Sequence, residues 1–313
     1  MLERLPAKVS VYEVGPRDGL QNEAAKLPVD ARVRLIEALV ASGERRMEVG
    51  SFVSPKWIPQ LSETEDVVRR LGQPPGTNFS ALVPNRQGLD RALASGIREV
   101  AVFLSASETH SKKNINKSIA EALATYAELV PVAVKAGLRV RGYVSVVWGC
   151  PYEGAVPIER VVEISQALTK MGIYELSLGD TIGVGTPRQT ETILKALLAV
   201  LPADKLAVHL HDTRGTALAN ALAALGCGIA TVDASVGGLG GCPYAPGASG
   251  NLATEDLVYM LHGMGIETGI DLEKLVAAGE LAQTLVGRKL TGKVLQAVIG
   301  SRERNRQASC QDS

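Results

Sequence analysis

The stretch Leu206-Ala-Val-His-Leu-His-Asp-Thr-Arg-Gly215 joins an apolar run to two histidines that are two positions apart. The run predicts a buried strand, and the closing glycine and the apolar helical pattern after it predict a loop and a helix. Side chains at i and i+2 of a strand point to the same face. His209 and His211 therefore project together and can bind one metal ion; the alternative is two unrelated histidines. The other two histidines of the chain, His110 and His262, are far away in sequence, so further ligands must come from other residue types.

Seven more short apolar or β-branched runs precede helical patterns along the chain. The predicted strands are Val9–Val14, Arg46–Phe52, Asn78–Leu82, Glu99–Leu104, Arg139–Val147, Glu175–Leu178, Leu206–Leu210 and Thr231–Ser235. Eight strand–helix units of roughly 20 to 40 residues indicate an α/β fold, a (β/α)8 TIM barrel; the alternative is an open doubly wound sheet. We expect a polar loop from Ser105 to Asn116 before the helix that follows the fourth strand. We also expect additional C-terminal helices after Asp271.

The length of 313 residues suits one catalytic barrel domain over residues 1–300, followed by a flexible polar tail over residues 301–313. Lys and Arg balance Asp and Glu at 33 each, which argues against a nucleic-acid-binding surface. No apolar run reaches the ~18 residues that span a bilayer. The first residues lack the apolar core of a signal peptide, and the four cysteines lack metal-ribbon spacing. We therefore expect a cytoplasmic protein with reduced thiols that does not bind membranes.

Polar side chains gather where the predicted strands end, which is where TIM barrels place their chemistry. They are Arg17, Asp18, Gln21, Glu48, Ser51, Tyr143, Ser177, Asp180, His209, His211 and Asn251. Two imidazoles, the Asp18 carboxylate and an amide oxygen from Asn251 form a mixed nitrogen and oxygen ligand set. Such a set suits Mg²⁺ or Mn²⁺, whereas zinc sites usually collect more His or Cys. A ferrous two-His-one-carboxylate site is the other reading of these residues.

The segment from Gly237 to Gly250 is rich in glycine and carries Cys242. A glycine-rich loop can approach a ligand closely and can move as a lid. Its cysteine is either a filler or a proton-transfer group beside the metal, and we favour the second reading.

Together these residues resemble the hydroxymethylglutaryl-CoA lyase family, from residue 9 to about residue 290. The stretches that carry the resemblance are Val14-Gly-Pro-Arg-Asp-Gly-Leu-Gln-Asn-Glu23, Ser51-Phe-Val-Ser-Pro-Lys-Trp57, Lys112-Lys-Asn-Ile-Asn116, Gly149-Cys-Pro-Tyr-Glu-Gly154, Ser177-Leu-Gly-Asp-Thr-Ile-Gly183, His209 to Asp212, and Gly237-Gly-Leu-Gly-Gly-Cys-Pro-Tyr244. The Arg-Asp and His-x-His pieces are shared by a wider superfamily of barrel lyases and Claisen-type synthases, and the glycine-rich piece with Cys242 is more specific to the lyases.

The resemblance implies metal-dependent retro-Claisen cleavage of (S)-3-hydroxy-3-methylglutaryl-CoA to acetyl-CoA and acetoacetate. It implies that Asp18, His209, His211 and Asn251 bind the metal, that Arg17 is the essential arginine and that Cys242 is the catalytic cysteine. We expect catalysis to involve Cys242, Arg17, Asp18 and His209. We expect substrate contacts from Arg17, Gln21, Glu48, Ser51, Tyr143, Ser177 and Asp180. The expected partners are an acyl-CoA substrate and further copies of the same chain in a homo-oligomer.

Three other functions fit the same residues less well. They are cleavage of a related 3-hydroxyacyl-CoA, condensation by a Claisen-type synthase, and CoA or metal binding without catalysis. Two departures from the family pattern concern the substrate: Arg214 stands where many relatives carry an aromatic residue, and His110 stands where an apolar one is expected. We expect Arg214 to lie near the acyl pocket and to favour short dicarboxyl substrates, unless it points into solvent.

Overall fold

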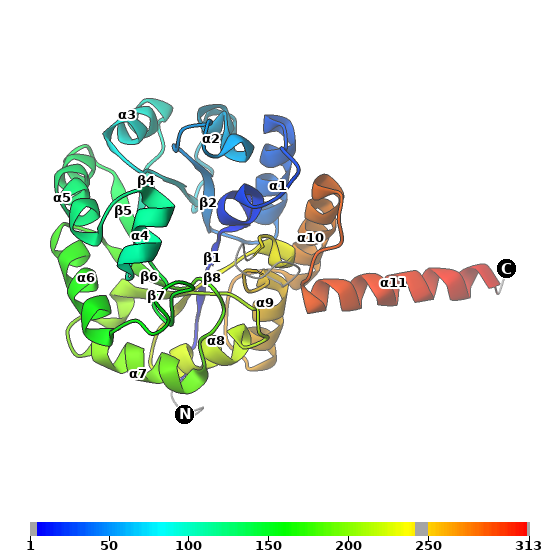
Figure 1. The fold of residues 1–313 in the computed structure, drawn as a ribbon. Coiled ribbons are helices and arrows are strands. Elements are labelled where there is room, and N and C mark those ends of the chain that lie inside the picture. Colours follow the sequence, from blue (N-terminus) through cyan, green and yellow to red (C-terminus); the bar gives the residue numbers. More distant parts are fainter. Residues whose placement is uncertain (1–4, 242–249, 312–313) are drawn as a thin grey trace.

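The computed structural model of this chain describes residues 5–241 and 250–311, and its centre is a closed barrel of eight parallel strands (Figure 1). The strands follow one another around the barrel in chain order, and β1 closes the ring by pairing with β8. They are β1 (Ser10–Glu13), β2 (Arg46–Ser51), β3 (Asn78–Leu82), β4 (Glu99–Ser105), β5 (Arg139–Ser145), β6 (Glu175–Asp180), β7 (Leu206–Leu210) and β8 (Thr231–Ala234). The TIM barrel expected from the sequence is confirmed.

Helices surround the barrel and cover the outer faces of the strands (Figure 1). They are α1 (Val29–Ala41), α2 (Thr64–Leu71), α3 (Arg86–Ser95), α4 (Glu108–Ile115), α5 (Ile119–Lys135), α6 (Ile158–Lys170), α7 (Pro187–Leu198), α8 (Ala217–Gly226), α9 (Thr254–Gly263), α10 (Leu272–Val286) and α11 (Lys293–Gln311). In the described part of the chain, no helix is long and apolar enough to cross a bilayer.

Local sequence sets the ends of these helices. At α3, the Asn85 side chain accepts a hydrogen bond from the Gly88 amide at 2.9 Å, and the helix ends at Gly96, whose φ is 80°. A cap of this kind stabilises a helix by about 1 kcal/mol, and glycine adopts positive φ without the steric penalty of a Cβ. The apolar faces of the helices then pack on the strands, which form one continuous core with them.

The interior of the barrel is polar, in contrast to the branched apolar layers that fill many TIM barrels. Arg141 of β5 is fully buried and crosses the interior to reach Asp233 of β8, with Nη2 and Oδ1 2.7 Å apart. Its Nε donates to Glu175 of β6 at 2.7 Å, and its guanidinium carbon lies 3.9 Å from the centre of the Tyr12 ring. Arg46 of β2 pairs with the same Glu175 at 2.8 Å. Ion pairs and stacking therefore fill the space between the strands.

The predicted polar loop from Ser105 to Asn116 is wrong, because α4 lies within it. The Ser107 side chain accepts a hydrogen bond from the His110 amide at 3.2 Å, and Asn116 ends the helix in the left-handed conformation. The segment escaped detection because it is polar and lacks an apolar repeat. Capping residues at its two ends were the remaining signal.

The last helix, α11, runs from Lys293 to Gln311 and projects away from the barrel (Figure 1). It therefore continues through residue 300, where the sequence analysis places the end of the barrel domain. The division into residues 1–300 and a flexible tail stays a prediction, but the part of the tail up to Gln311 is helical.

Candidate active site

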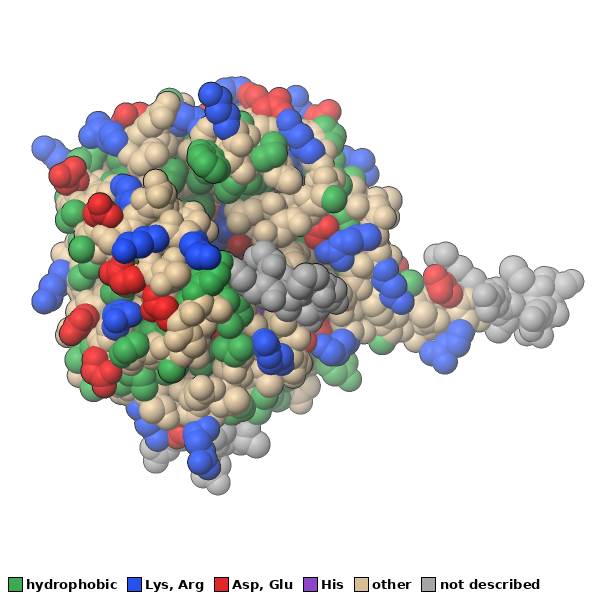
Figure 2. Space-filling view, in the orientation of Figure 1, with side chains coloured by type: hydrophobic (Ala, Val, Ile, Leu, Met, Phe, Trp, Pro, Cys, Tyr) green, Lys and Arg blue, Asp and Glu red, His purple; other side chains and the backbone are tan. Residues whose placement is uncertain are grey.

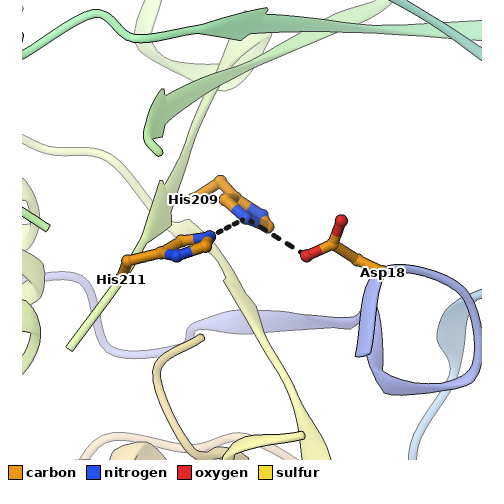
Figure 3. A group of neighbouring side chains, drawn as sticks. All are labelled: Asp18, His209 and His211. Carbon is orange, nitrogen blue, oxygen red and sulfur yellow. Dashed lines mark hydrogen bonds and ion pairs between the residues drawn. The ribbon is translucent and has the colours of Figure 1, made fainter. Parts of the chain in front are cut away.

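Three side chains that could bind a metal ion converge at the end of the barrel where the strands terminate (Figure 3). His209 belongs to β7, His211 follows it directly, and Asp18 comes from a single π-helical turn after β1, Gly15–Gly19. The Nε2 atoms of His209 and His211 lie 3.2 Å apart, and Asp18 Oδ2 lies 3.8 Å from His209 Nε2. The two histidines project together, as the strand period predicts.

The spacing of these donor atoms fits one divalent cation. Ligands about 2.1 Å from an octahedral ion lie roughly 3 Å from their nearest neighbours. One potential ligand atom from each of Asp18, His209 and His211 can be chosen so that all lie within 4.8 Å of one another. Burial, followed by electrostatic interaction with the neighbouring His209, lowers the pKa of His211 to about 4. His211 is therefore neutral near pH 7, as a metal ligand must be.

Arg17 lies between two carboxylates beside this cluster. Its Nε donates to Glu48 at 2.5 Å and its Nη1 donates to Asp18 at 2.7 Å. Burial of Asp18 opposes its charged form, but the charge of Arg17 and electrostatic interactions with the two histidines outweigh burial and lower its pKa to about 2. Asp18 is therefore a carboxylate at neutral pH. That state suits a metal ligand and makes the group a weak base.

The turn that carries Arg17 and Asp18 is held by Glu13 at the end of β1. The Glu13 carboxylate accepts hydrogen bonds from the backbone amides of Gly15 at 2.7 Å and Val236 at 2.9 Å. It also accepts one from the Thr254 hydroxyl at 2.7 Å. One buried side chain thus connects the start of the π-helical turn with the chain on both sides of the glycine-rich segment.

Asn251 lies beside the cluster, but its amide nitrogen faces Asp18. Nδ2 donates to Asp18 Oδ2 at 2.8 Å and to the Leu239 carbonyl at 3.1 Å, and the backbone of Asn251 bridges to that of His211. The structure therefore brings all four predicted ligands together. Coordination through the amide oxygen of Asn251 stays a prediction.

The glycine-rich segment leaves and rejoins the site at adjacent points. Gly250 accepts a hydrogen bond from the Asp212 amide at 2.7 Å, and a Cβ added to Gly250 would lie 2.5 Å from the Gly240 carbonyl oxygen. Gly240 and Gly250 therefore touch, and a side chain at Gly250 would prevent this close approach. Cys242 lies outside the described residues, and its catalytic role stays a prediction.

A cavity of about 780 Å³ opens above the cluster, and the face is visibly hollowed there (Figure 2). Seven residues predicted from the sequence line it: Arg17, Asp18, Gln21, Tyr143, Ser177, His209 and His211. The far wall comes from the chain after β2 and from α4, including Trp57, His110 and Lys113. Lys113 Nζ lies 4.2 Å from the centre of the Tyr152 ring. Trp57 was not singled out as a site residue in the sequence analysis, although it closes one of the family-like stretches.

Three predicted substrate-binding residues are buried outside the lining of the cavity. Glu48 holds Arg17 and accepts a hydrogen bond from the Tyr143 hydroxyl at 3.2 Å. Ser51 Oγ accepts one from the Val53 amide at 3.1 Å. Asp180 accepts hydrogen bonds from two backbone amides, those of Val184 at 3.0 Å and Gly185 at 2.9 Å. Their visible contacts are with other parts of the protein, and direct contact with substrate stays a prediction.

The expected position of Arg214 near the acyl pocket is wrong. Its side chain is exposed, and Nη1 donates to the backbone carbonyls of Ile182 at 2.7 Å and Gly183 at 3.1 Å. Arg214 does not line the cavity. It fastens the loop after β6 instead of facing substrate.

Asp233 is a site residue that the sequence analysis missed. Its Oδ2 lies 3.3 Å from Nδ1 of His209, on the side of the ring opposite the cluster. The signal that pointed to it was an acidic residue within the predicted buried strand Thr231–Ser235, because buried carboxylates need partners.

Comparisons with known proteins agree with this geometry. The sequence pattern of the HMGL-like family matches residues 8–282. A hydroxymethylglutaryl-CoA lyase of Bacillus subtilis (strain 168) is 53% identical over 296 residues, which cover 95% of this chain and 99% of the relative. The crystal structure of the B. subtilis HMG-CoA lyase superimposes with a TM-score of 0.92 at 52% identity, covering 94% of this chain and 99% of that one. An HMG-CoA lyase from Acinetobacter baumannii, solved with coenzyme A and 3-methylmalate, gives a TM-score of 0.89 at 38% identity, with coverages of 93% and 95%. The chain therefore belongs to the HMGL-like family, together with these hydroxymethylglutaryl-CoA lyases.

Proposed function

We propose that this protein cleaves (S)-3-hydroxy-3-methylglutaryl-CoA to acetyl-CoA and acetoacetate by a retro-Claisen reaction. The observation that carries the proposal is the convergence of Arg17, Asp18, His209 and His211 on one cavity at the barrel mouth. The names of the matched relatives support the same substrate, and the relative solved with coenzyme A supports an acyl-CoA ligand for a cavity of this kind.

We further propose that the resident cation is Mg²⁺ or Mn²⁺, held by Asp18, His209 and His211, with Asn251 as a fourth ligand. Hard cations favour oxygen ligands and keep room for substrate, which suits a set with only two imidazoles. When bound, such a cation stabilises negative charge on the hydroxyl oxygen of the substrate.

The protein's own residues account for the remaining chemistry. In the reaction the tertiary hydroxyl loses its proton, the C2–C3 bond breaks and its electron pair moves into the thioester enolate. The enolate then gains a proton and leaves as acetyl-CoA. Arg17 lines the cavity with a guanidinium fixed by Glu48, so it can stabilise the enolate oxygen without reorganising. Tyr143 donates to the same Glu48 and helps to fix that pair.

Cys242 is our candidate for the group that transfers a proton. The low pKa of Asp18 supports this choice, because a carboxylate with a pKa of about 2 is a poor base near neutral pH. We expect Cys242→Ala to lower kcat by about a hundredfold or more. Cys227→Ala, a half-buried cysteine of α8's C-terminal cap, is the control and should keep full activity. Equal rates in the two variants would reject the role.

The proposed function is tested by chelation, gel filtration and assay with (S)-3-hydroxy-3-methylglutaryl-CoA. We expect turnover to disappear with the metal and to return on addition of Mg²⁺ or Mn²⁺. His209→Ala should lose both turnover and metal, whereas His262→Ala, far from the site in sequence, should keep both. Full turnover in protein that contains no metal would overturn the metal site. A metal-loaded protein that does not cleave this substrate would overturn the activity.

The assembly and location of the protein remain part of the proposal. We propose a homo-oligomer in the cytoplasm; the projection of α11 away from the barrel supports the first part, because it offers surface to a second copy (Figure 1). Light scattering of the full chain should give the mass of a dimer or a larger assembly. A mass near 33.0 kDa would show a monomer instead.

A further inference from the structure

Asp233 of β8 lies directly beneath a proposed metal ligand. His209 and Asp233 are register partners on the neighbouring strands β7 and β8, and both side chains enter the barrel. Asp233 Oδ2 lies 3.3 Å from Nδ1 of His209, while Nε2 of the same ring faces His211 and Asp18 (Figure 3). One ring edge therefore faces the cluster and the other faces a buried carboxylate.

The carboxylate of Asp233 is held on both oxygens. Arg141 donates from Nη1 to Oδ2 at 3.1 Å and from Nη2 to Oδ1 at 2.7 Å, and the Ser177 hydroxyl donates to Oδ2 at 2.7 Å. Asp233 is 1% exposed and Arg141 is fully buried. A two-pronged guanidinium contact fixes the plane of a carboxylate, so Asp233 presents Oδ2 to His209 in one orientation.

The charge of Asp233 decides which hydrogen bond forms. The guanidinium of Arg141 donates to both oxygens of Asp233 and pairs with it as an ionised carboxylate. An ionised carboxylate can only accept, so Nδ1 of His209 must carry the proton. A histidine that binds a metal is neutral and has a single N–H, so Nε2 of His209 presents its lone pair to the cluster.

We propose that Asp233 is a positioning residue that fixes His209 in the tautomer and orientation needed to bind a divalent cation through Nε2. Arg141 and Ser177 act through Asp233 by holding its carboxylate. A partner of this kind typically changes metal affinity 10- to 100-fold when removed. The inference rests on the metal site of the proposed function, but not on the identity of the acyl-CoA.

The first test reads the tautomer in the metal-free wild-type protein. Nitrogen NMR of histidine-labelled protein distinguishes a protonated Nδ1 from a protonated Nε2, and four histidines keep the spectrum simple. The His209 signals are those that disappear in His209→Gln. We expect a protonated Nδ1 at His209. A protonated Nε2 at this residue overturns the proposal without any variant of Asp233.

The second test compares two buried carboxylates that share Arg141. Asp233→Asn removes the charge next to His209, and Glu175→Gln removes the other partner of Arg141, which donates to Glu175 from Nε at 2.7 Å. Each substitution removes one of the two carboxylates that pair with Arg141, so each should lower the free energy of unfolding. We expect Asp233→Asn to bind Mn²⁺ 10- to 100-fold more weakly, measured from the free-ion signal in electron paramagnetic resonance. Glu175→Gln should stay within about twofold of wild type, because its contact with His209 is indirect.

Two outcomes of this second test overturn the proposal. Equal Mn²⁺ affinity in Asp233→Asn and wild type overturns the proposal, and so does an equal loss in Glu175→Gln, since that loss would be general. If Asp233→Asn does not fold, the double variant with Arg141→Met removes the buried charge pair together and must show the same weakening. These measurements use Mn²⁺ alone. A wild-type protein that binds Mn²⁺ but leaves hydroxymethylglutaryl-CoA intact would reject the activity and not the role of Asp233.

Discussion

Arg17 and Arg141 have similar neighbours but lie in different parts of the molecule. Both are buried, both pair with two carboxylates and both lie near the ring of Tyr143, at 5.5 and 4.9 Å. Arg141 directs Nε and both terminal nitrogens at carboxylates inside the barrel. Arg17 sits on a turn at the cavity and directs Nε and Nη1 at carboxylates. The two arginines therefore differ in position and not in the kind of partner: Arg17 can reach a ligand in the cavity, whereas Arg141 is enclosed within the barrel.

The largest expected effect is the loss of turnover when the charge of Arg17 is removed from the cavity. Arg17→Gln should lower kcat by about a thousandfold, because the charge at the enolate oxygen is lost. Arg17→Lys should fail in a similar way, since lysine cannot reproduce the planar fork. Steady-state assay of both variants measures the effect, and retained metal content shows that the site is intact. A variant near the wild-type rate would make Arg17 a structural residue and would remove the contrast with Arg141.

The second prediction concerns the ion pairs that Arg141 makes inside the barrel. Arg141→Met leaves Asp233 and Glu175 buried without their shared cation, and this should cost about 3 to 5 kcal/mol in the free energy of unfolding. Urea unfolding measures the loss, with Arg17→Gln as the matched variant. We expect the loss in Arg17→Gln to be smaller, because Asp18, one of its two carboxylates, lines the cavity and is partly exposed. A larger loss of stability in Arg17→Gln would show that Arg17 contributes more to the stability of the fold than Arg141 does.

The third prediction concerns carboxylates that are held by backbone amides instead of arginines. Burial raises the pKa of Glu13 to about 7 and that of Glu255, which binds the Gly237 amide at 2.7 Å, to about 8, both from 4.5. A raised pKa in the folded state contributes stability that is fully present below 4.5 and is lost as the pH rises through 7 to 8. The free energy of unfolding should therefore fall from about pH 4.5 to about pH 8 and level off above that, by at most about 1.4 kcal/mol per pH unit for each group.

Urea unfolding across this pH range checks the third prediction. Glu255→Gln should flatten part of the slope, because the variant cannot ionise there. Glu280→Gln, which changes a half-buried carboxylate of α10 that pairs with Arg302, is a control that should leave the slope unchanged. A flat profile in the wild type, or the same slope in Glu255→Gln, would show that these carboxylates do not govern the pH response.

The sequence predicted the barrel and the convergence of ligands for a simple geometric reason. Alternation along a strand places His209 beside His211, and closure of the barrel brings the end of β1 to the end of β7. Asp18 therefore meets the two histidines although nearly two hundred positions separate them. The strands themselves were marked by apolar runs, and their observed limits differ from the predicted ones by only a few residues.

The parts that could not be predicted depend on contacts across the fold. Asp233 lies in mid-strand and gains its role from the register of β8 against β7 and from Arg141 of β5. The direction of Arg214 depends on carbonyls in the loop after β6. Neither contact leaves a periodic trace in the sequence. The helix α4 is polar, and only its caps reveal it.

The contact between Gly240 and Gly250 means that the chain between them begins and ends at nearly the same point. Gly240 and Gly250 touch, and the chain that follows Gly250 is pinned to β7 by the hydrogen bond from the Leu252 amide to the Leu210 carbonyl at 2.9 Å. A segment with such ends can be lengthened, shortened or exchanged with little entropic penalty for closing the loop. Variation between these two points can therefore change the proposed proton-transfer residue while the barrel, with Asp18, His209 and His211, stays in place.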